Sequence, residues 1–226
     1  MLSLKNTECR PWVASTSETS LAEHMKDCLD DEKELVLLFL DIRNFTAFVE
    51  SHQRPEVFQV IRSLFTTLDQ IIVSHNGVII ETGGDSIYAI FGLDDVKPDS
   101  VQMAVESGFS ILSKIKKLNS TFFRQQFHQT IEVGIGLHVG RVIVGNLKLK
   151  TIDHLMVMGA PVIIASRLES ATKQLNNNFI ISDEIFDRLL SYPEKSIAVT
   201  IALKGLKEPF HAHLIGEPFK CNYFNK

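Results

Sequence analysis

Val36-Leu-Leu-Phe-Leu-Asp-Ile42 is an almost continuous run of apolar residues, interrupted by one aspartate close to its end. A run of this length and composition is typical of a strand that is buried on both faces of a sheet. Arg43-Asn-Phe-Thr46 follows directly and begins a predicted helix at residues 44–52. An ionisable side chain, Asp41, is therefore predicted where a core strand ends and a helix begins.

A second carboxylate stands in a comparable place. Glu81-Thr-Gly-Gly-Asp85 joins two predicted strands, 78–81 and 86–91, through a tight turn at the glycine pair. In a ferredoxin-like core the first strand lies beside the strand that leaves this hairpin, so we expect Asp41 and Asp85 to converge. Two neighbouring carboxylates repel each other unless cations lie between them, and hard divalent cations prefer oxygen ligands. The pair predicts a site for two Mg²⁺ or Mn²⁺ ions; the alternative is that each aspartate only caps a helix or turn.

The residues after Asp41 suggest what such ions would act on. Backbone N–H groups at a helix N-terminus bind phosphate groups well. We therefore predict that Arg43, Asn44, Phe45 and Thr46 contact the phosphates of a substrate.

The rest of the chain alternates between helical and strand patterns. Helices are predicted at 17–35, 54–75, 100–118, 161–174 and in a segment ending at 190; strands are predicted at 132–138 and 141–147, joined at Val139-Gly140, and at 155–158, 178–182, 197–203 and 210–215. This order predicts an α+β fold with a ferredoxin-like βαββαβ core. We divide the chain into a tail with a short helix (1–33), one domain (34–216) and a C-terminal tail (217–226).

Composition excludes several classes of protein. The net charge is −4 and the charged residues are of mixed sign, which is not the basic balance typical of proteins that bind nucleic acid or anionic membranes. Three widely spaced cysteines predict neither a disulfide framework nor a zinc site. The sequence has no signal-peptide pattern and no run of about 18 or more apolar residues. We expect a cytoplasmic protein without a nucleic-acid or membrane partner.

Five segments then follow one another in a recognisable order: Phe39–Thr46, Glu81–Asp85, Gly134–Gly145, Gly159–Glu169 and Lys204–Pro209. Together they resemble the catalytic domain of class III adenylyl and guanylyl cyclases over about residues 34–216. The resemblance implies a head-to-tail homodimer with active sites at the interface, and two divalent cations, Mg²⁺ or Mn²⁺. It also implies a nucleoside triphosphate substrate whose ribose 3′-oxygen attacks the α-phosphate while pyrophosphate leaves.

The resemblance also assigns roles to single residues. It makes the aspartate pair the metal ligands, assisted by the carbonyl of Ile42. Arg141 takes the place of an arginine near the phosphates, and Lys207 that of a residue that reaches the outer phosphates. Arg167 takes the place of an arginine that stabilises charge on the phosphorus, a role that a preorganised cation fills well.

Three positions depart from the family pattern, and they concern the base and the ribose. Glu81 stands where adenylyl cyclases have lysine, Met156 where the family has aspartate, threonine or cysteine, and Ile163 where it has asparagine. Glutamate and methionine lack the donor and acceptor pair that adenine needs. Since methionine is bulky and apolar and fills space that a purine would need, we expect a pyrimidine substrate, UTP or CTP. Small cyclases of this kind resemble the pyrimidine cyclases of bacterial anti-phage systems, and that resemblance implies a cyclic-nucleotide-responsive effector.

Other functions stay open at this point. Glu81 equally suits a guanylyl cyclase, and an adenylyl cyclase in ordinary second-messenger signalling is a further alternative. The loss of asparagine at Ile163 fits a weakly active pseudo-cyclase that binds nucleotide and regulates another protein. A metal-dependent phosphatase or nuclease would also use paired carboxylates.

Overall fold

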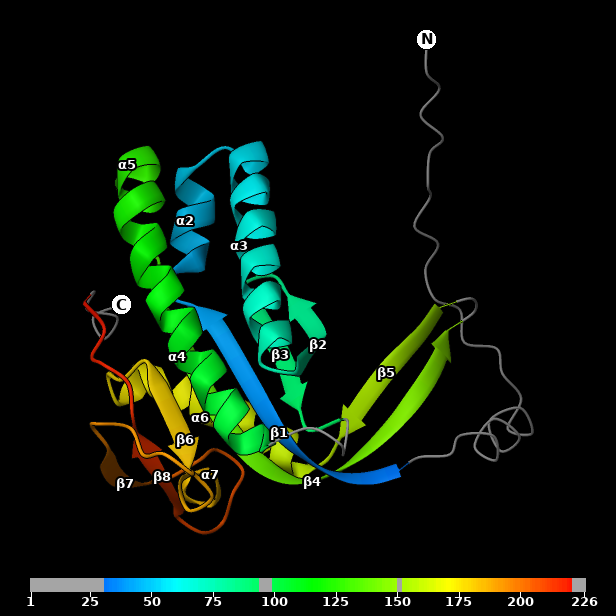
Figure 1. Cartoon of the computed structure of the whole chain (residues 1–226). Coiled ribbons are helices and arrows are strands. Elements are labelled where there is room, and N and C mark those ends of the chain that lie inside the picture. Colours follow the sequence, from blue (N-terminus) through cyan, green and yellow to red (C-terminus); the bar gives the residue numbers. More distant parts are fainter. Residues whose placement is uncertain (1–30, 94–98, 150–151, 221–226) are drawn as a thin grey trace.

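The computed structural model describes residues 31–93, 99–149 and 152–220. Within these ranges eight strands form one mixed sheet in the order β2-β3-β1-β4-β6-β8-β7, and β5 pairs with β4 beside this path. The strands are β1 (Asp31–Ile42), β2 (Gly77–Gly83), β3 (Ser86–Phe91), β4 (Val133–Leu149), β5 (Ile152–Met158), β6 (Phe179–Ser182), β7 (Ile197–Ile201) and β8 (Phe210–Leu214) (Figure 1).

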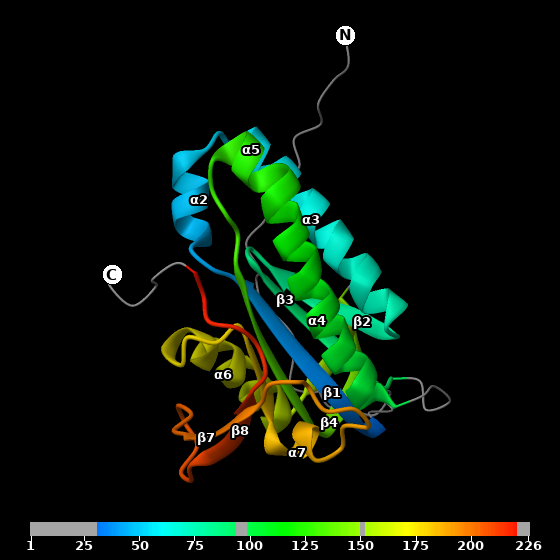
Figure 2. The ribbon, with the colours of Figure 1, turned by 60° about the vertical axis from the view of Figure 1, so that its left-hand side comes forward.

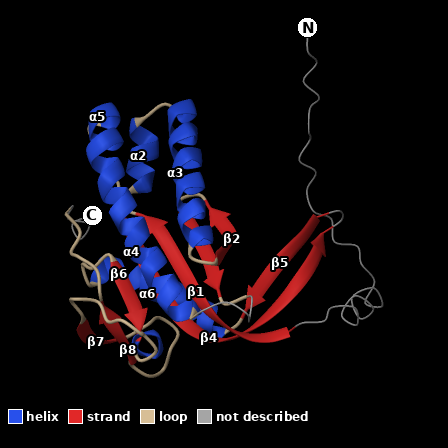
Figure 3. Ribbon diagram, in the orientation of Figure 1, coloured by secondary structure: helices blue, strands red, loops and turns tan. Residues whose placement is uncertain are grey.

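Helices cover both faces of this sheet (Figures 1 and 3). They are α2 (Phe45–Ser51), α3 (Arg54–Ser74), α4 (Ser100–Leu118), the π-helical turn η1 (Asn119–Phe123), α5 (Arg124–Phe127), α6 (Ala160–Gln174) and α7 (Asp183–Phe186). The order of the first six core elements, β1, α3, β2, β3, α4 and β4, is the predicted βαββαβ order. The predicted α+β class is therefore confirmed.

β1 lies at the centre of the sheet because its apolar run is covered on both sides. It pairs antiparallel with β3 through Val36–Asp41 and with β4 over its whole length. Leu35 to Leu38 and Leu40 are completely buried. The prediction of a strand buried on both faces is confirmed.

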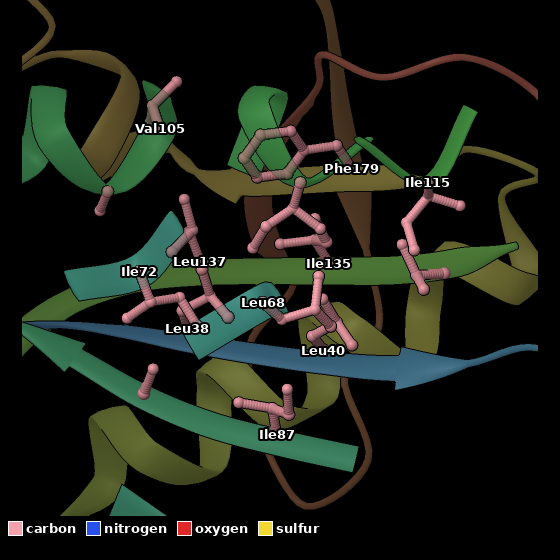
Figure 4. Close-up of a cluster of buried hydrophobic side chains, with 14 of the residues drawn as sticks. Leu38, Leu40, Leu68, Ile72, Ile87, Val105, Ile115, Ile135, Leu137 and Phe179 are labelled. Atoms are coloured by element: carbon pink, nitrogen blue, oxygen red, sulfur yellow. The ribbon is translucent and has the colours of Figure 1, made fainter. Parts of the chain in front are cut away.

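The main core lies between the sheet and the helices α3 and α4. Leu38 and Leu40 of β1 and Ile135 and Leu137 of β4 point from the sheet toward Leu68 and Ile72 of α3 and toward the apolar face of α4 (Figure 4). This layer of sheet and helices forms one side of the α+β sandwich.

α6 covers the opposite face and packs directly on β4 (Figure 2). Close approach is possible because Gly134, Gly136 and Gly140 have no side chain there. A β-carbon on Gly136 would overlap the backbone of α6 at Glu169, and one on Gly140 would overlap Pro161. α6 is thereby held in a fixed register along β4, with Thr172 beside Gly134 and Pro161 beside Gly140.

Two predicted elements are wrong in the N-terminal and central parts of the chain. Residues 31–35 are strand and not helix, because Asp31 to Leu35 pair with β4; the remainder of the predicted helix at 17–35 lies outside the described residues. Val139-Gly140 is not a turn, because both residues pair with β1 inside the continuous strand β4. The second half of β4 continues beyond the sheet body as an arm with β5.

The last predicted helix is also shorter than expected. α7 ends at Phe186, and a turn at residues 187–188 followed by irregular chain replaces the predicted helix to Leu190. Within the described ranges, no helix has both the length and the apolar character to span a membrane.

Candidate active site

Asp41 and Asp85 lie on neighbouring strands at the same edge of the sheet. Asp41 is the penultimate residue of β1 and pairs with Ser86 of β3. The backbone N–H of Ile42 donates to the carbonyl of Asp85 at 3.1 Å. Asp85 occupies the hairpin turn, where Gly84 has a positive φ of 64° that a glycine adopts without strain. This main-chain hydrogen bond therefore keeps the positions of Asp41 and Asp85 close together.

The electrostatics of this edge suit a cation. The pKa of Asp41 is raised to about 6 from an ordinary value of 3.8; burial is the largest cause, Arg43 and Lys173 oppose it, and the charge of Asp85 adds to it. A carboxylate that is partly buried next to a second one is stabilised by a bound divalent ion. Two carboxylates and a backbone carbonyl are the hard oxygen ligands that Mg²⁺ or Mn²⁺ prefers.

Few further protein ligands are available for such ions. The described residues contain no cluster of three or more histidine, cysteine, aspartate or glutamate side chains that could hold a metal. Two carboxylates fit a site in which the substrate completes the coordination shell, as Mg²⁺ does with phosphates.

Arg43, a predicted phosphate contact, has a guanidinium that is paired with carboxylates of the chain itself. Its guanidinium forms an ion pair with Glu169 of α6 and lies 3.2 Å from Asp41. The Arg43 side chain is only 9% exposed to solvent. A second hydrogen bond runs to Thr172 at 3.1 Å. The backbone N–H of Arg43 donates to the carbonyl of Glu132 at 2.8 Å. Among the described contacts, Arg43 reaches the aspartate pair through Asp41.

The next three residues form the entry to α2. Asn44 is the N-cap in a left-handed conformation with φ of 59°, and its side chain makes no capping bond. Asn44 and Thr46 are exposed. Phe45 is half-buried and packs against the core, so its side chain is structural. Phosphate binding stays a prediction for Asn44, for Thr46 and for the backbone N–H groups of the first turn of α2, because such groups have no partners within a helix.

Glu81 lies on β2, a strand of the hairpin, and Met156 lies on β5, a strand of the arm. Glu81 is exposed near the end of β2, where the register with β3 shifts between Ile79 and Glu81. Such a bulge redirects a side chain. Met156 is half-buried on β5, opposite Gly145 of β4. β2 and β5 are in contact, so the two predicted base-reading positions lie on neighbouring elements.

Arg167 is not brought to Asp41 within one chain. Successive residues of a helix are rotated by about 100°, so Arg167 points roughly opposite to Glu169 and Thr172, which face β4 and Arg43. Ile163, one turn earlier, shares the face of Arg167 and is 57% exposed. The Nε atom of Arg167 is buried and has no hydrogen-bond partner among the described residues.

The two remaining predicted phosphate ligands are exposed. Arg141 lies on β4, opposite Glu34 of β1. Lys207 lies in the turn between β7 and β8, and so does Lys204. The structure does not bring either residue to Asp41 or Asp85.

Comparison with known proteins identifies the family. The profile described as "Adenylate and Guanylate cyclase catalytic domain" matches residues 29–215. The chain belongs to this family. It is 30% identical over 180 residues to an adenylate cyclase of Anabaena cylindrica, which covers 78% of this chain and 35% of that protein. It is 31% identical over 155 residues to retinal guanylyl cyclase 2 of Bos taurus, covering 67% of this chain and 14% of that one.

Solved structures agree with this assignment. The guanylyl cyclase Cya2 superposes with a TM-score of 0.73 at 26% identity, covering 87% of this cyclase domain and 97% of that chain. The domain spans only about a third or less of the first curated relatives that it matches.

Sequence reasoning missed the residues that support the cyclase site. Glu169 and Thr172 were not predicted as partners of Arg43, although Glu169 closes one of the five quoted motifs. The helical spacing of Ala165, Leu168, Glu169 and Thr172 carries the signal, because these residues share one buried face. Because Glu169 and Thr172 are polar residues on this buried face, they predict a polar partner in the sheet beneath α6.

Proposed function

We propose that this cyclase domain converts a nucleoside triphosphate into a 3′,5′-cyclic nucleotide and pyrophosphate. The observation that carries the proposal is the main-chain hydrogen bond from Ile42 to Asp85, which keeps the two aspartate positions close together at one end of neighbouring strands. Divalent cations at this edge would polarise the α-phosphate and lower the pKa of the ribose 3′-hydroxyl.

The chain's own residues would position these partners. Asp41, Asp85 and the Ile42 carbonyl would hold the ions, and the exposed residues Asn44 and Thr46 would border the phosphates. Arg167 would stabilise the charge that develops on the phosphorus, since its buried Nε atom has no other partner among the described residues. Arg141 and Lys207 would neutralise the outer phosphates as exposed cations.

We further propose that the active site needs two copies of the chain. Arg167 lies on the face of α6 opposite to Glu169, which pairs with Arg43 beside Asp41, so one copy would not supply both Arg167 and the aspartate pair to one substrate. Large apolar side chains are exposed on β4, β5 and α6, respectively: Ile143 (52%), Met158 (58%) and Ile163 (57%). Ile143 and Met158 are direct neighbours across β4 and β5. A head-to-tail homodimer would cover them and complete two sites.

For the base we propose a pyrimidine. Glu81 is exposed and accepts hydrogen bonds, for example from N3–H of uracil or the amino group of cytosine. Met156 occupies the second base-reading position with an apolar side chain. Cyclic UMP or cyclic CMP would then act on a cyclic-nucleotide-responsive effector in bacterial anti-phage signalling, in the cytoplasm. Guanylyl and adenylyl cyclase activity in ordinary second-messenger signalling are the alternatives.

The test is a product assay with the purified chain, Mn²⁺ and each of the four nucleoside triphosphates, resolved by mass spectrometry. A cyclic product from UTP or CTP is expected. A product from GTP or ATP alone would keep the cyclase and refute the pyrimidine. Nucleoside monophosphate or cleaved nucleic acid would indicate a phosphatase or nuclease instead.

A pseudo-cyclase is the second candidate, and the observation in its favour is Ile163. An exposed isoleucine on the face of Arg167 cannot supply the polar contact of the usual asparagine, which by analogy with oxyanion-hole donors is worth about 10²–10³ in rate. Nucleotide binding without any cyclic product would support this candidate.

A further inference from the structure

The proposed reaction leaves one buried charge beside the metal ligands unexplained. The guanidinium of Arg43 lies 3.2 Å from Asp41 Oδ1, and its side chain is only 9% exposed. A permanent cation thus lies next to the carboxylate that is proposed to bind divalent cations. Left unbalanced in a partly buried place, this charge would oppose metal binding, because Coulomb repulsion is strong where water is excluded.

Glu169 balances this charge from the other side. It is a buried residue of α6 and forms an ion pair with Arg43 Nη2, which also donates to Thr172 Oγ1 at 3.1 Å. The arrangement has a dedicated space: a β-carbon on Gly134 would overlap the Arg43 guanidinium. Gly134 is also the residue of β4 that pairs with Asp41. The guanidinium therefore lies between Asp41 and α6, in contact with both.

We propose that Glu169 is a positioning residue of the metal site, because it binds Arg43 and neutralises its charge so that Asp41 stays available to divalent cations. This inference rests on the proposed function, since it requires Asp41 to be a metal ligand. It assigns Arg43 a role different from phosphate binding. Arg43 stabilises the ionised carboxylate of Asp41 while no metal is bound, and Glu169 limits the strength of this attraction.

A purely structural role for the ion pair predicts something different. If Arg43 and Glu169 only fastened α6 to the sheet, removal of either partner would disturb Asp41 in the same way. Charge balance predicts opposite effects. Glu169→Gln leaves the Arg43 charge directed at Asp41, whereas Arg43→Gln removes that charge and leaves the site more negative.

The experiment measures Mn²⁺ binding to the full chain without nucleotide, by the electron paramagnetic resonance signal of free Mn²⁺. Glu169→Gln is expected to weaken binding about tenfold. Arg43→Gln is expected to leave the affinity unchanged or to raise it by up to about tenfold. The double variant, in which two neutral amides replace the ion pair, is expected to bind at least as tightly as the wild type. Thermal unfolding in a chelator shows which variants are folded.

The double variant keeps the inference falsifiable if a single variant folds poorly, because replacing a buried pair by neutral groups is often tolerated. Weaker binding in both single variants, with the double variant weaker still, would overturn the charge-balance role. If the wild type turns over a nucleotide but the variants show this pattern of weaker binding, only the charge-balance inference fails. If the wild type binds no more Mn²⁺ than the Asp41→Asn/Asp85→Asn variant, the metal site and this inference both fail.

Discussion

The backbone N–H of Ile42 donates to the carbonyl of Asp85 across 3.1 Å, so the end of β1 and the turn of the β2–β3 hairpin are fixed to each other. Because the connection is made by main-chain atoms, substitution of either aspartate side chain leaves it in place. The carboxylates can therefore be removed one at a time without loss of the local fold.

The first prediction concerns these carboxylates. Asp41→Asn and Asp85→Asn should each lower cyclic nucleotide formation by about 100-fold or more, because each removes a charged ligand of the proposed cations. The product assay measures the loss, and size-exclusion chromatography checks that the assembly of the chain is unchanged. Near-normal turnover in either variant would exclude a two-metal site here.

The pKa of Asp41 gives a second prediction. In the folded, metal-free protein this pKa is raised to about 6 by burial, with a further contribution from Asp85, against 3.8 in an unfolded chain. Between these two values the folded state binds more protons at Asp41 than the unfolded state, so the contribution of Asp41 to the free energy of unfolding falls as pH rises toward 6 and is constant above it.

Asp41→Asn removes the ionisable group and with it this loss of stability at higher pH. At pH 8 and in a chelator the variant should have a free energy of unfolding about 1–2 kcal/mol higher than the wild type, after allowance for solvent screening. The difference should shrink toward pH 4. Urea unfolding at both pH values measures it, with Glu81→Gln, an exposed carboxylate, as the control. An equal difference at the two pH values would contradict the cause. Mn²⁺ should stabilise the wild type but not the variant.

A third prediction concerns the space beneath Arg43. Gly134→Ala places a methyl group where the guanidinium lies, so Arg43 must leave its contacts with Glu169 and Thr172. We expect a loss of stability of about 1–3 kcal/mol from the separated buried charges, together with loss of cyclase activity. Gly84→Ala is the matched control, since no atom lies within 4 Å of its added β-carbon and only the positive φ is strained. A fully stable Gly134→Ala protein would contradict the packing described here.

The local pattern of the sequence was sufficient for the first strand, the hairpin and the βαββαβ order. These follow from one long apolar run and a glycine pair, which are local signals. The Arg43–Glu169 pair could not be predicted in the same way, because the partners are 126 positions apart and meet only when α6 packs against glycines of β4. The turn predicted at Val139-Gly140 failed for a related reason. Gly140 serves the approach of Pro161 and not a change of chain direction.

The orientation of α6 gives a fourth prediction. If one site takes its aspartates from one chain and Arg167 from the other, an equal mixture of inactive Asp41→Asn and inactive Arg167→Ala proteins, co-refolded, forms heterodimers with one intact site each. The mixture should recover roughly a quarter of wild-type activity, because half of the dimers are mixed and half of their sites are intact. Separately refolded proteins, mixed under conditions in which dimers do not exchange, serve as the control. Absence of recovery would place all these residues in one chain's site.

The base preference gives the last prediction. Glu81 accepts hydrogen bonds but offers no donor, and Met156 offers neither, whereas adenine needs a donor for N1 and an acceptor for its amino group. Glu81→Lys together with Met156→Asp supplies both groups, at one exposed and one half-buried position that tolerate polar side chains. The double variant should gain turnover of ATP and lose turnover of the wild-type substrate, each by about tenfold or more, since a site built to hydrogen-bond one base leaves polar groups unpaired against another. Competition between all four nucleoside triphosphates, with products resolved by mass, measures both changes in one reaction. Glu81→Gln with Met156→Leu is the control that keeps size and removes charge. If the double variant loses its original substrate without gaining ATP while nucleotide binding persists, Glu81 and Met156 do not select the base.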